Sequence, residues 1–240
     1  MPLLLFDIDG TLTLSGQQIK DEMISTIEKL AGHDNIVLGL VGGGTLEKIR
    51  WQMRDAIKYF KYVFAECGAI VCVNQKVVSE KNMLDACDRN LLNNLIRKSL
   101  HEISQMPIIY HGNPIDFRKG LIYVSPPGMQ ATDYERNIFI DRDKKLGLRN
   151  NLITQLRALD PDQVFEIAIG GAVGVAIYPK GWDKSQVIEH VKNEYPGQIY
   201  YFGDKTEPGG NDYPIYSHKL VQGVSVTDYF DTIKKLQAMF

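Results

Sequence analysis

The first third of the chain alternates short, continuous apolar runs with stretches of helical spacing. Residues 3–8 and 36–41 are almost wholly apolar, as in strands that are buried on both faces. Residues 17–31 between them place apolar side chains every three or four positions, which predicts a helix that packs one face on a core. The same signals recur as a helix at 46–60 and strands at 62–64 and 69–73. This rhythm predicts parallel βαβ units in a three-layer α/β core.

The middle of the chain follows another pattern. Helical spacing at 84–105 gives way, at 107–125 and 163–178, to the apolar–polar alternation of antiparallel strands. Turn-forming residues at 111–114 and 169–171 predict where those strands reverse direction.

From Trp182 onward the strand–helix rhythm returns, with a strand expected at 198–203 and a last helix near 227–239. The predicted fold class is therefore α/β, a three-layer Rossmann-like core with an α+β segment inserted into it. The domain boundaries predicted from these changes give a discontinuous core, residues 1–80 and 182–240, and an inserted domain, 81–181.

Composition and charge exclude several classes of partner. Apolar residues make up 44% of the 240 positions and charged residues 23%, the ordinary mix of a globular protein. A net charge of -2 gives no general attraction to nucleic acid or to an anionic membrane. No apolar stretch approaches the roughly 20 residues that span a bilayer. The three cysteines lack metal-ligand spacing, so we expect reduced thiols in a cytoplasmic protein.

Acidic residues follow the predicted strands. Asp7 and Asp9 end the first strand, Asp204 directly follows the strand at 198–203, and Asp212 lies in the glycine-rich loop beyond it. Strand-end loops of one parallel sheet meet at one edge, so these carboxylates are expected to share a pocket. Like charges persist together when a cation lies between them, and oxygen ligands suit Mg²⁺. An isolated Asp-x-Asp would be interpreted as a turn, whereas four acids at strand ends favour a metal pocket.

Groups that suit a phosphate also occur near predicted strand ends. The segment Gly42-Gly43-Gly44-Thr45 follows a strand and opens a helix, so its backbone N–H groups can cradle an anion. Lys184 lies at a predicted helix start, where a lysine can neutralise both a phosphate and Asp7. Each signal is weak alone, because glycine loops often only form turns and lysines are common on surfaces.

Taken in order, these elements match the four motifs of the haloacid dehalogenase superfamily. More narrowly, the chain resembles the eukaryotic-type phosphomannomutase family along nearly its whole length. The resembling stretches are residues 6–13, 62–68, 116–126, 178–184 and 201–212. The resemblance implies a haloacid dehalogenase core with the larger α+β cap that this superfamily's sugar-phosphate enzymes use.

The resemblance also implies roles for the acidic residues and the lysine. Asp7 would be the nucleophile that forms an aspartyl-phosphate, and Asp9 the general acid and base at the sugar oxygen. Lys184 would stabilise the transferring charge. Mg²⁺ would be held by Asp7, the Asp9 backbone carbonyl and Asp204, and Asp212 would support the metal.

Substrate contacts are implied in the same way. Gly43 and Gly44 of the loop would bind the phosphate, and Thr45 would replace a serine that the family has next to it. In the cap, Arg118 and Arg136 match arginines that grip the sugar phosphate, for which a planar guanidinium is well shaped. A mutase of this kind needs a hexose 1,6-bisphosphate activator, and the family's cap contact implies a homodimer.

The chain departs from the family pattern at positions that recognise substrate or belong to a motif. The differing residues are Gly16, His111 and Met129 (arginine in the family), Gly44 and Gly174 (serine), Ala176 (aspartate) and Cys67 (asparagine). Loss of one charged phosphate contact typically costs about a hundredfold in affinity. The chemical carboxylates are intact, so phosphoryl transfer at Asp7 is better supported than mannose 1-phosphate as the substrate.

Three functional hypotheses follow. The leading one is a phosphomannomutase that interconverts mannose 6-phosphate and mannose 1-phosphate through an Asp7 phosphoenzyme. The alternative is a phosphatase of the same superfamily, in which water attacks the aspartyl-phosphate and the cap admits another sugar phosphate. The third is a weakly active paralogue with a binding role, which has no evident need of a concentrated acidic pocket.

Overall fold

The computed structural model describes residues 1–240, and these form two units. The first unit combines Met1–Lys81 with Trp182–Phe240, and the second is the continuous segment Asn82–Gly181. None of the helices combines the length and the apolar composition that a bilayer-spanning segment needs.

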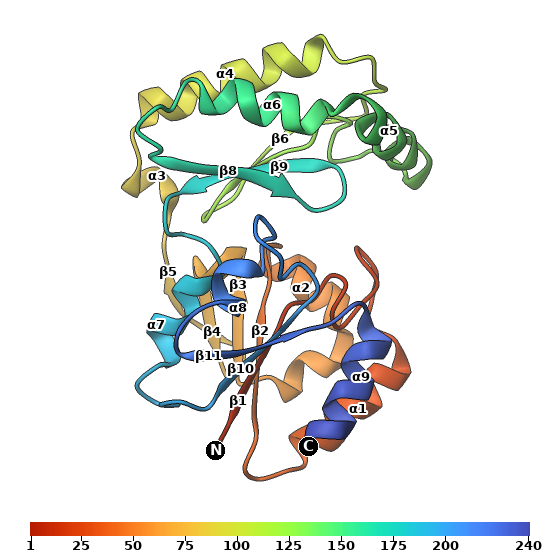
Figure 1. Ribbon diagram of the computed structural model, residues 1–240, viewed down its shortest axis with the longest axis vertical. Coiled ribbons are helices and arrows are strands. Elements are labelled where there is room, and N and C mark those ends of the chain that lie inside the picture. Colours follow the sequence, from red (N-terminus) through yellow and green to blue (C-terminus); the bar gives the residue numbers. More distant parts are fainter. The chain divides into compact units, whose positions relative to one another are not determined.

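A seven-stranded sheet forms the centre of the first unit, in the order β11-β10-β1-β2-β3-β4-β5 (Figure 1). The strands are β1 Leu3–Phe6, β2 Val37–Val41, β3 Tyr62–Ala65, β4 Ile70–Val73, β5 Lys76–Glu80, β10 Ile199–Gly203 and β11 Val221–Ser225. The strands from β11 to β3 are parallel, whereas β4 and β5 add an antiparallel hairpin at one edge. The predicted α/β core is confirmed, and the strand predicted at 69–73 joins it as the antiparallel strand β4, outside the parallel βαβ units.

Helices cover both faces of this sheet and make three layers (Figure 1). The helices are α1 Asp21–Ala31, α2 Leu46–Met53, α7 Ile188–Val191, α8 Tyr213–Tyr216 and α9 Tyr229–Met239. The packing of successive β1 residues explains why this strand is continuously apolar. Leu4 and Phe6 pack with α1, α2 and α9, while Leu3 and Leu5 pack against the α7 side. A strand buried on both faces has no polar alternation.

The helix predicted at 46–60 is interrupted. The α-helix ends at Met53, and Arg54 has φ 50°, outside the helical region. A 3₁₀ helix then continues over Arg54–Tyr59. Helical spacing of apolar side chains survives such a break, so the periodicity did not indicate it.

The second unit is a four-stranded antiparallel sheet, ordered β6-β7-β9-β8, with α4 (Arg89–Ser104) and α6 (Leu148–Arg157) over one face (Figure 1). Its elements are α3 Met83–Ala86, α4 Arg89–Ser104, β6 Ile115–Phe117, β7 Ile122–Val124, α5 Asp133–Leu146, α6 Leu148–Arg157, β8 Phe165–Gly170 and β9 Gly174–Pro179. The turn predicted at 169–171 lies at the β8–β9 reversal. The prediction that strands reverse at 111–114 was wrong, because this segment precedes β6 and the β6–β7 hairpin reverses after Phe117.

Candidate active site

Three aspartates meet at the carboxyl ends of neighbouring strands. Asp7 follows β1 and Asp204 follows β10, and these strands pair in parallel with Phe6 opposite Phe202. Carboxylate oxygens of Asp7, Asp204 and Asp212 all lie within 4.8 Å of one another. The structure therefore brings together three of the four acids that the sequence placed in one pocket.

Burial gives these carboxylates unequal proton affinities. It raises the pKa of Asp7 to about 7, although Lys184 acts in the opposite direction. Burial likewise raises the pKa of Asp204. For Asp212 burial also favours the neutral form, but Lys184 outweighs it and leaves the pKa below its usual value.

Lys184 supplies the positive charge of the cluster. It opens a 3₁₀ helix, Lys184–Val187, and is fully buried. Its Nζ donates to Asp7 Oδ1 at 2.5 Å and to Asp212 Oδ1 at 2.6 Å. Burial would lower the pKa of Lys184, but the two carboxylates more than compensate and raise it, so the ammonium form is held in place.

Tyr201 also belongs to this cluster and was not identified from the sequence. Its buried hydroxyl donates to Asp212 Oδ1 at 2.6 Å, and Lys184 Nζ lies 3.4 Å from the same hydroxyl. The signal in the sequence was a phenol placed two positions before the Gly203-Asp204 motif on a buried strand. An aromatic residue at such a position is ordinarily predicted to belong to the hydrophobic core.

The Asp9 carboxylate lies outside the three-acid cluster. Its oxygens accept hydrogen bonds from Lys48 Nζ at 3.0 Å, Gln52 Nε2 at 2.8 Å and the Gly16 backbone N–H at 2.6 Å. Burial acts to raise the pKa of Asp9, but the charge of Lys48 and these donors lower it overall. Asp9 is therefore held as a carboxylate, and its expected metal contact through the backbone carbonyl stays a prediction.

The glycine-rich loop is tied to the segment that follows β3. The Gly42 N–H donates to Phe64 O at 2.9 Å, and Gly44 O accepts from the Glu66 N–H at 3.0 Å. Thr45 is the N-cap of α2, with its hydroxyl accepting from the Lys48 N–H at 3.2 Å. This contact gives Thr45 a structural role, and the substrate roles expected for Gly43 and Gly44 stay predictions.

The two predicted phosphate-binding arginines belong to the second unit. Arg118 lies just after β6, where its Nε donates to Asp116 Oδ2 at 2.7 Å and its guanidinium lies 4.9 Å from the Tyr123 ring centroid. Arg136 lies in α5. Their roles toward a substrate remain predictions.

Tyr123 explains one departure from the family pattern. A Cβ at Gly174 would lie 2.2 Å from Tyr123 Cζ, so no side chain fits there unless the ring moves. The ring is fixed by a hydrogen bond from Tyr123 Oη to Gly170 O at 2.9 Å, and Tyr123 is the register partner of Ala176. His111, another departure, contacts the α5 capping-box residue Glu135 at 3.0 Å.

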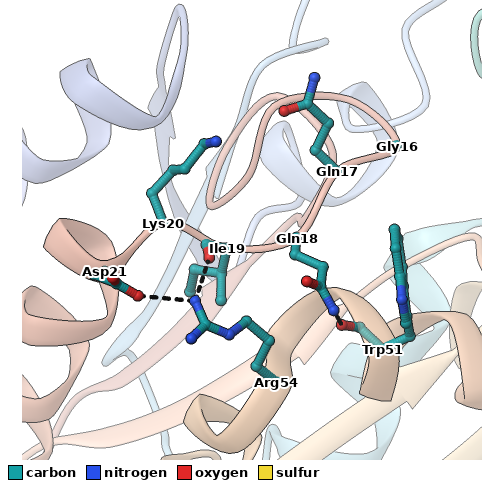
Figure 2. A pocket seen from close by; sticks show the side chains of 8 residues that line it. All are labelled: Gly16, Gln17, Gln18, Ile19, Lys20, Asp21, Trp51 and Arg54. Carbon is teal, nitrogen blue, oxygen red and sulfur yellow. Dashed lines mark hydrogen bonds and ion pairs between the residues drawn. The ribbon is translucent and has the colours of Figure 1, made fainter.

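A cavity of about 400 Å³ opens beside the loop that carries Gly16. Its lining residues include Gly16 and Gln18 from this loop and Trp51 and Arg54 from the segment at the end of α2 (Figure 2). Arg54 is engaged within the wall, donating to Asp21 at 2.8 Å and to the Ile19 carbonyl at 3.3 Å. The cavity therefore lies beside the loop whose Gly16 N–H binds Asp9, and none of the three clustered aspartates lines it.

Comparisons with known proteins agree on a family and on a fold. A family model described as eukaryotic phosphomannomutase matches residues 23–240. The chain is 35% identical to a phosphomannomutase of Encephalitozoon cuniculi, over 98% of this chain and 91% of that protein. It is also 35% identical to a phosphomannomutase of Schizosaccharomyces pombe, over 99% and 94% of the two chains.

Solved structures share the fold at low sequence identity. A truncated, IMP-bound IMP-nucleotidase of Plasmodium falciparum matches with a TM-score of 0.69 and 15% identity, over 99% of this chain and 68% of that one. A trehalose-6-phosphate phosphatase related protein matches with a TM-score of 0.58 and 17% identity, over 99% and 96%.

Proposed function

Because the chain belongs to the eukaryotic phosphomannomutase family of the haloacid dehalogenase superfamily, we propose that it is a phosphomutase that interconverts mannose 6-phosphate and mannose 1-phosphate. The observation that carries the proposal is the buried contact between Asp7 and Lys184 at the centre of three carboxylates. A nucleophilic carboxylate beside a fixed cation and other acids suits phosphoryl transfer.

In this proposal an Asp7 oxygen attacks phosphorus, and the bond from phosphorus to the sugar oxygen breaks. Lys184 is charged and immobile, so it can stabilise negative charge that develops on the transferring group without reorganising. Tyr201 and Lys184 both donate to Asp212 Oδ1, so the position of this carboxylate is fixed as well. Asp9 accepts the proton of an attacking sugar hydroxyl and returns it to the leaving sugar oxygen.

The residues of the cluster fit Mg²⁺. All three side chains offer oxygen ligands, and Asp204 Oδ1 is a buried polar atom with no hydrogen-bond partner. Asp7 and Asp204 would hold the ion together with the Asp9 backbone carbonyl, Asp212 would support it, and its charge would polarise a bound phosphate. Gly10 permits the close packing at this place, because a Cβ there would lie 2.5 Å from Asp204 Oδ2.

The second unit is the proposed substrate-recognition cap. Arg118 and Arg136 would bind the sugar phosphate, and a second copy of the chain would pair through this unit. All three cysteines are free, which supports the proposed cytoplasmic location, where thiols stay reduced. Light scattering of the purified protein tests the proposed dimer.

A phosphatase acting on another sugar phosphate is the second candidate. The observation that favours it is Tyr123, whose ring excludes any side chain at Gly174, a position where the family has serine. A cap altered in this way has room for a different substrate, while the chemistry at Asp7 is unchanged. A role in binding alone does not explain a buried lysine among three acids.

The test follows mannose 6-phosphate and free phosphate together. Purified protein is incubated with Mg²⁺, mannose 1-phosphate and a trace of a hexose 1,6-bisphosphate. The proposal expects mannose 6-phosphate with almost no free phosphate, and a requirement for the bisphosphate. Free phosphate without the bisphosphate would indicate the phosphatase. Activity that persists in Asp7→Asn would contradict both, since each needs the Asp7 nucleophile.

A further inference from the structure

We propose that Lys48 and Gln52 of α2 are positioning residues that hold the Asp9 carboxylate in the orientation that its proton transfer requires. The inference rests on the proposed function, because it assumes that Asp9 acts at the sugar oxygen. It adds two residues to the reaction that lie outside the acidic cluster and outside the motifs from which the site was predicted.

The two side chains reach different oxygens of Asp9. Lys48 Nζ lies 3.0 Å from Oδ2, and Gln52 Nε2 lies 2.8 Å from Oδ1. Residues one helical turn apart point the same way, so a single helix face presents both donors. With both oxygens bound, rotation of the Asp9 carboxylate about its terminal bond breaks at least one hydrogen bond.

Gln52 is the more deeply buried of the two. Its side chain is 1% exposed, although glutamine is a residue that proteins seldom bury completely. Its amide also lies 3.4 Å from the Gln17 carbonyl, so one nitrogen joins Asp9 to the following loop. The Lys48 side chain is 41% exposed and contributes charge as well as a donor.

The loop that supplies the third donor to Asp9 is fixed to the same helix. The Ile19 N–H donates to Gln52 O at 2.8 Å, and Gln18 Nε2 donates to Trp51 O at 3.0 Å, as Figure 2 shows for the second contact. This loop carries the Gly16 N–H that binds Asp9 at 2.6 Å. All three donors to Asp9 therefore depend on the position of α2.

Gly44 leaves room for the path of Lys48. A Cβ at Gly44 would lie 3.1 Å from Lys48 Cδ, which is a tight contact. The glycine at this position, where the family has serine, thus accommodates the lysine stem that leads to Asp9.

The chemistry provides a way to distinguish positioning from a general structural role. When Asp7 attacks a sugar phosphate, the sugar oxygen leaves with the bonding electrons and takes the proton that Asp9 accepted from the attacking sugar hydroxyl in the preceding step. When Asp7 attacks 4-nitrophenyl phosphate, the aryl oxygen leaves as a stable phenolate and needs no proton. Misplacement of Asp9 should therefore slow the first reaction and spare the first turnover of the second.

The experiment compares Gln52→Met, Lys48→Met and Lys48→Arg with wild type and with Arg50→Gln, an exposed position of the same helix. Steady-state kcat and KM are measured with mannose 1-phosphate, hexose 1,6-bisphosphate and Mg²⁺. Rapid mixing measures the first-turnover release of 4-nitrophenolate. Circular dichroism melts establish that each variant is folded.

The inference expects kcat for the sugar phosphate to fall about tenfold to a hundredfold in both methionine variants. KM and nitrophenolate release should stay within about twofold of wild type, and Lys48→Arg should recover most of the activity. Equal losses with both substrates, or unchanged kcat, would overturn the inference. A wild-type protein that is inactive on sugar phosphates would instead overturn the proposed function, and the inference with it.

Discussion

At the residue scale, the buried ammonium of Lys184 controls the acidic cluster. It makes short contacts with both Asp7 and Asp212 and has no exposed surface. A buried charge without a partner is costly. If Lys184 were removed, the buried carboxylates would be left without a compensating cation and would carry this cost. Lys184 and a bound metal should therefore partly substitute for each other in neutralising these acids.

We predict that Lys184→Met destabilises the metal-free protein by about 3–5 kcal/mol, because it leaves buried carboxylates uncompensated. Mg²⁺ should restore part of that loss, since the cation supplies charge at the same oxygens. The measurement is the free energy of unfolding in urea, with EDTA and with Mg²⁺.

The matched control for this prediction is Lys192→Met. Lys192 forms a surface pair with Glu189 at 2.6 Å, and exposed pairs of this kind contribute little to stability. A Lys184 variant that unfolds like the Lys192 variant, or that ignores Mg²⁺, would contradict the account.

A second residue-scale prediction concerns Cys67. This residue has φ 58°, a left-handed conformation that cysteine adopts at a cost and asparagine tolerates better. Cys67→Asn should therefore raise the unfolding free energy by about 1 kcal/mol. Cys87 has φ -125°, so Cys87→Asn should give no such gain. Equal changes in stability for the two substitutions, measured in thermal melts, would contradict the conformational explanation.

At the element scale, Glu194 joins the segment after α7 to the start of β3. Its carboxylate accepts from Lys61 Nζ at 2.5 Å and from the Tyr62 hydroxyl at 2.6 Å, and Tyr195 contacts it at 3.0 Å. The hydrogen bond from Lys61, followed by that from Tyr62, lowers the pKa of Glu194 from 4.5 to about 2. One carboxylate thus links a helix layer to the sheet.

This link predicts part of the acid sensitivity of the protein. A carboxyl whose pKa is lowered by folding stabilises the fold above its unfolded value, and this contribution disappears as pH falls from about 4.5 toward 2. Glu194→Gln should therefore reduce the slope of unfolding free energy against pH in that window. Urea titrations from pH 5 downward measure it, and parallel curves for the variant and wild type would refute the assignment.

At the scale of the whole molecule, the chain leaves the first unit and returns to it at one place. Lys81, its last residue before the second unit, has its Nζ 5.7 Å from the ring centroid of Trp182, where the first unit resumes. The segment between them has its own sheet and a buried cluster around Phe139, Leu148 and Val173. Such a segment has the features of an independently folding domain.

We predict that residues 82–181 fold when expressed alone. A domain of this size should melt cooperatively with an enthalpy of roughly 60–80 kcal/mol. Calorimetry of the isolated segment measures this value. A broad, non-cooperative transition would mean that the segment depends on the first unit for its stability.

The acidic cluster could be predicted from the sequence because its geometry follows from topology. Apolar runs located β1 and β10, and parallel strands bring the residues after them to one sheet edge, which places Asp7 near Asp204. The β4–β5 hairpin could not be predicted in this way. Its turn residues Asn74 and Gln75 both have positive φ, but the usual glycine signal is missing.

What the sequence by itself determined was therefore the family, the α/β core and the identity of the acids, since strand periodicity and contiguous motifs are local properties of the chain. Tertiary structure decided which side chains those acids meet. Gln52, Lys48 and Tyr201 carry no motif, and their contacts with Asp9 and Asp212 depend on how α2 and β10 pack in the first unit. A helix placed a few ångströms away would keep every local pattern and lose these bonds, because hydrogen bonds need donor–acceptor distances near 3 Å.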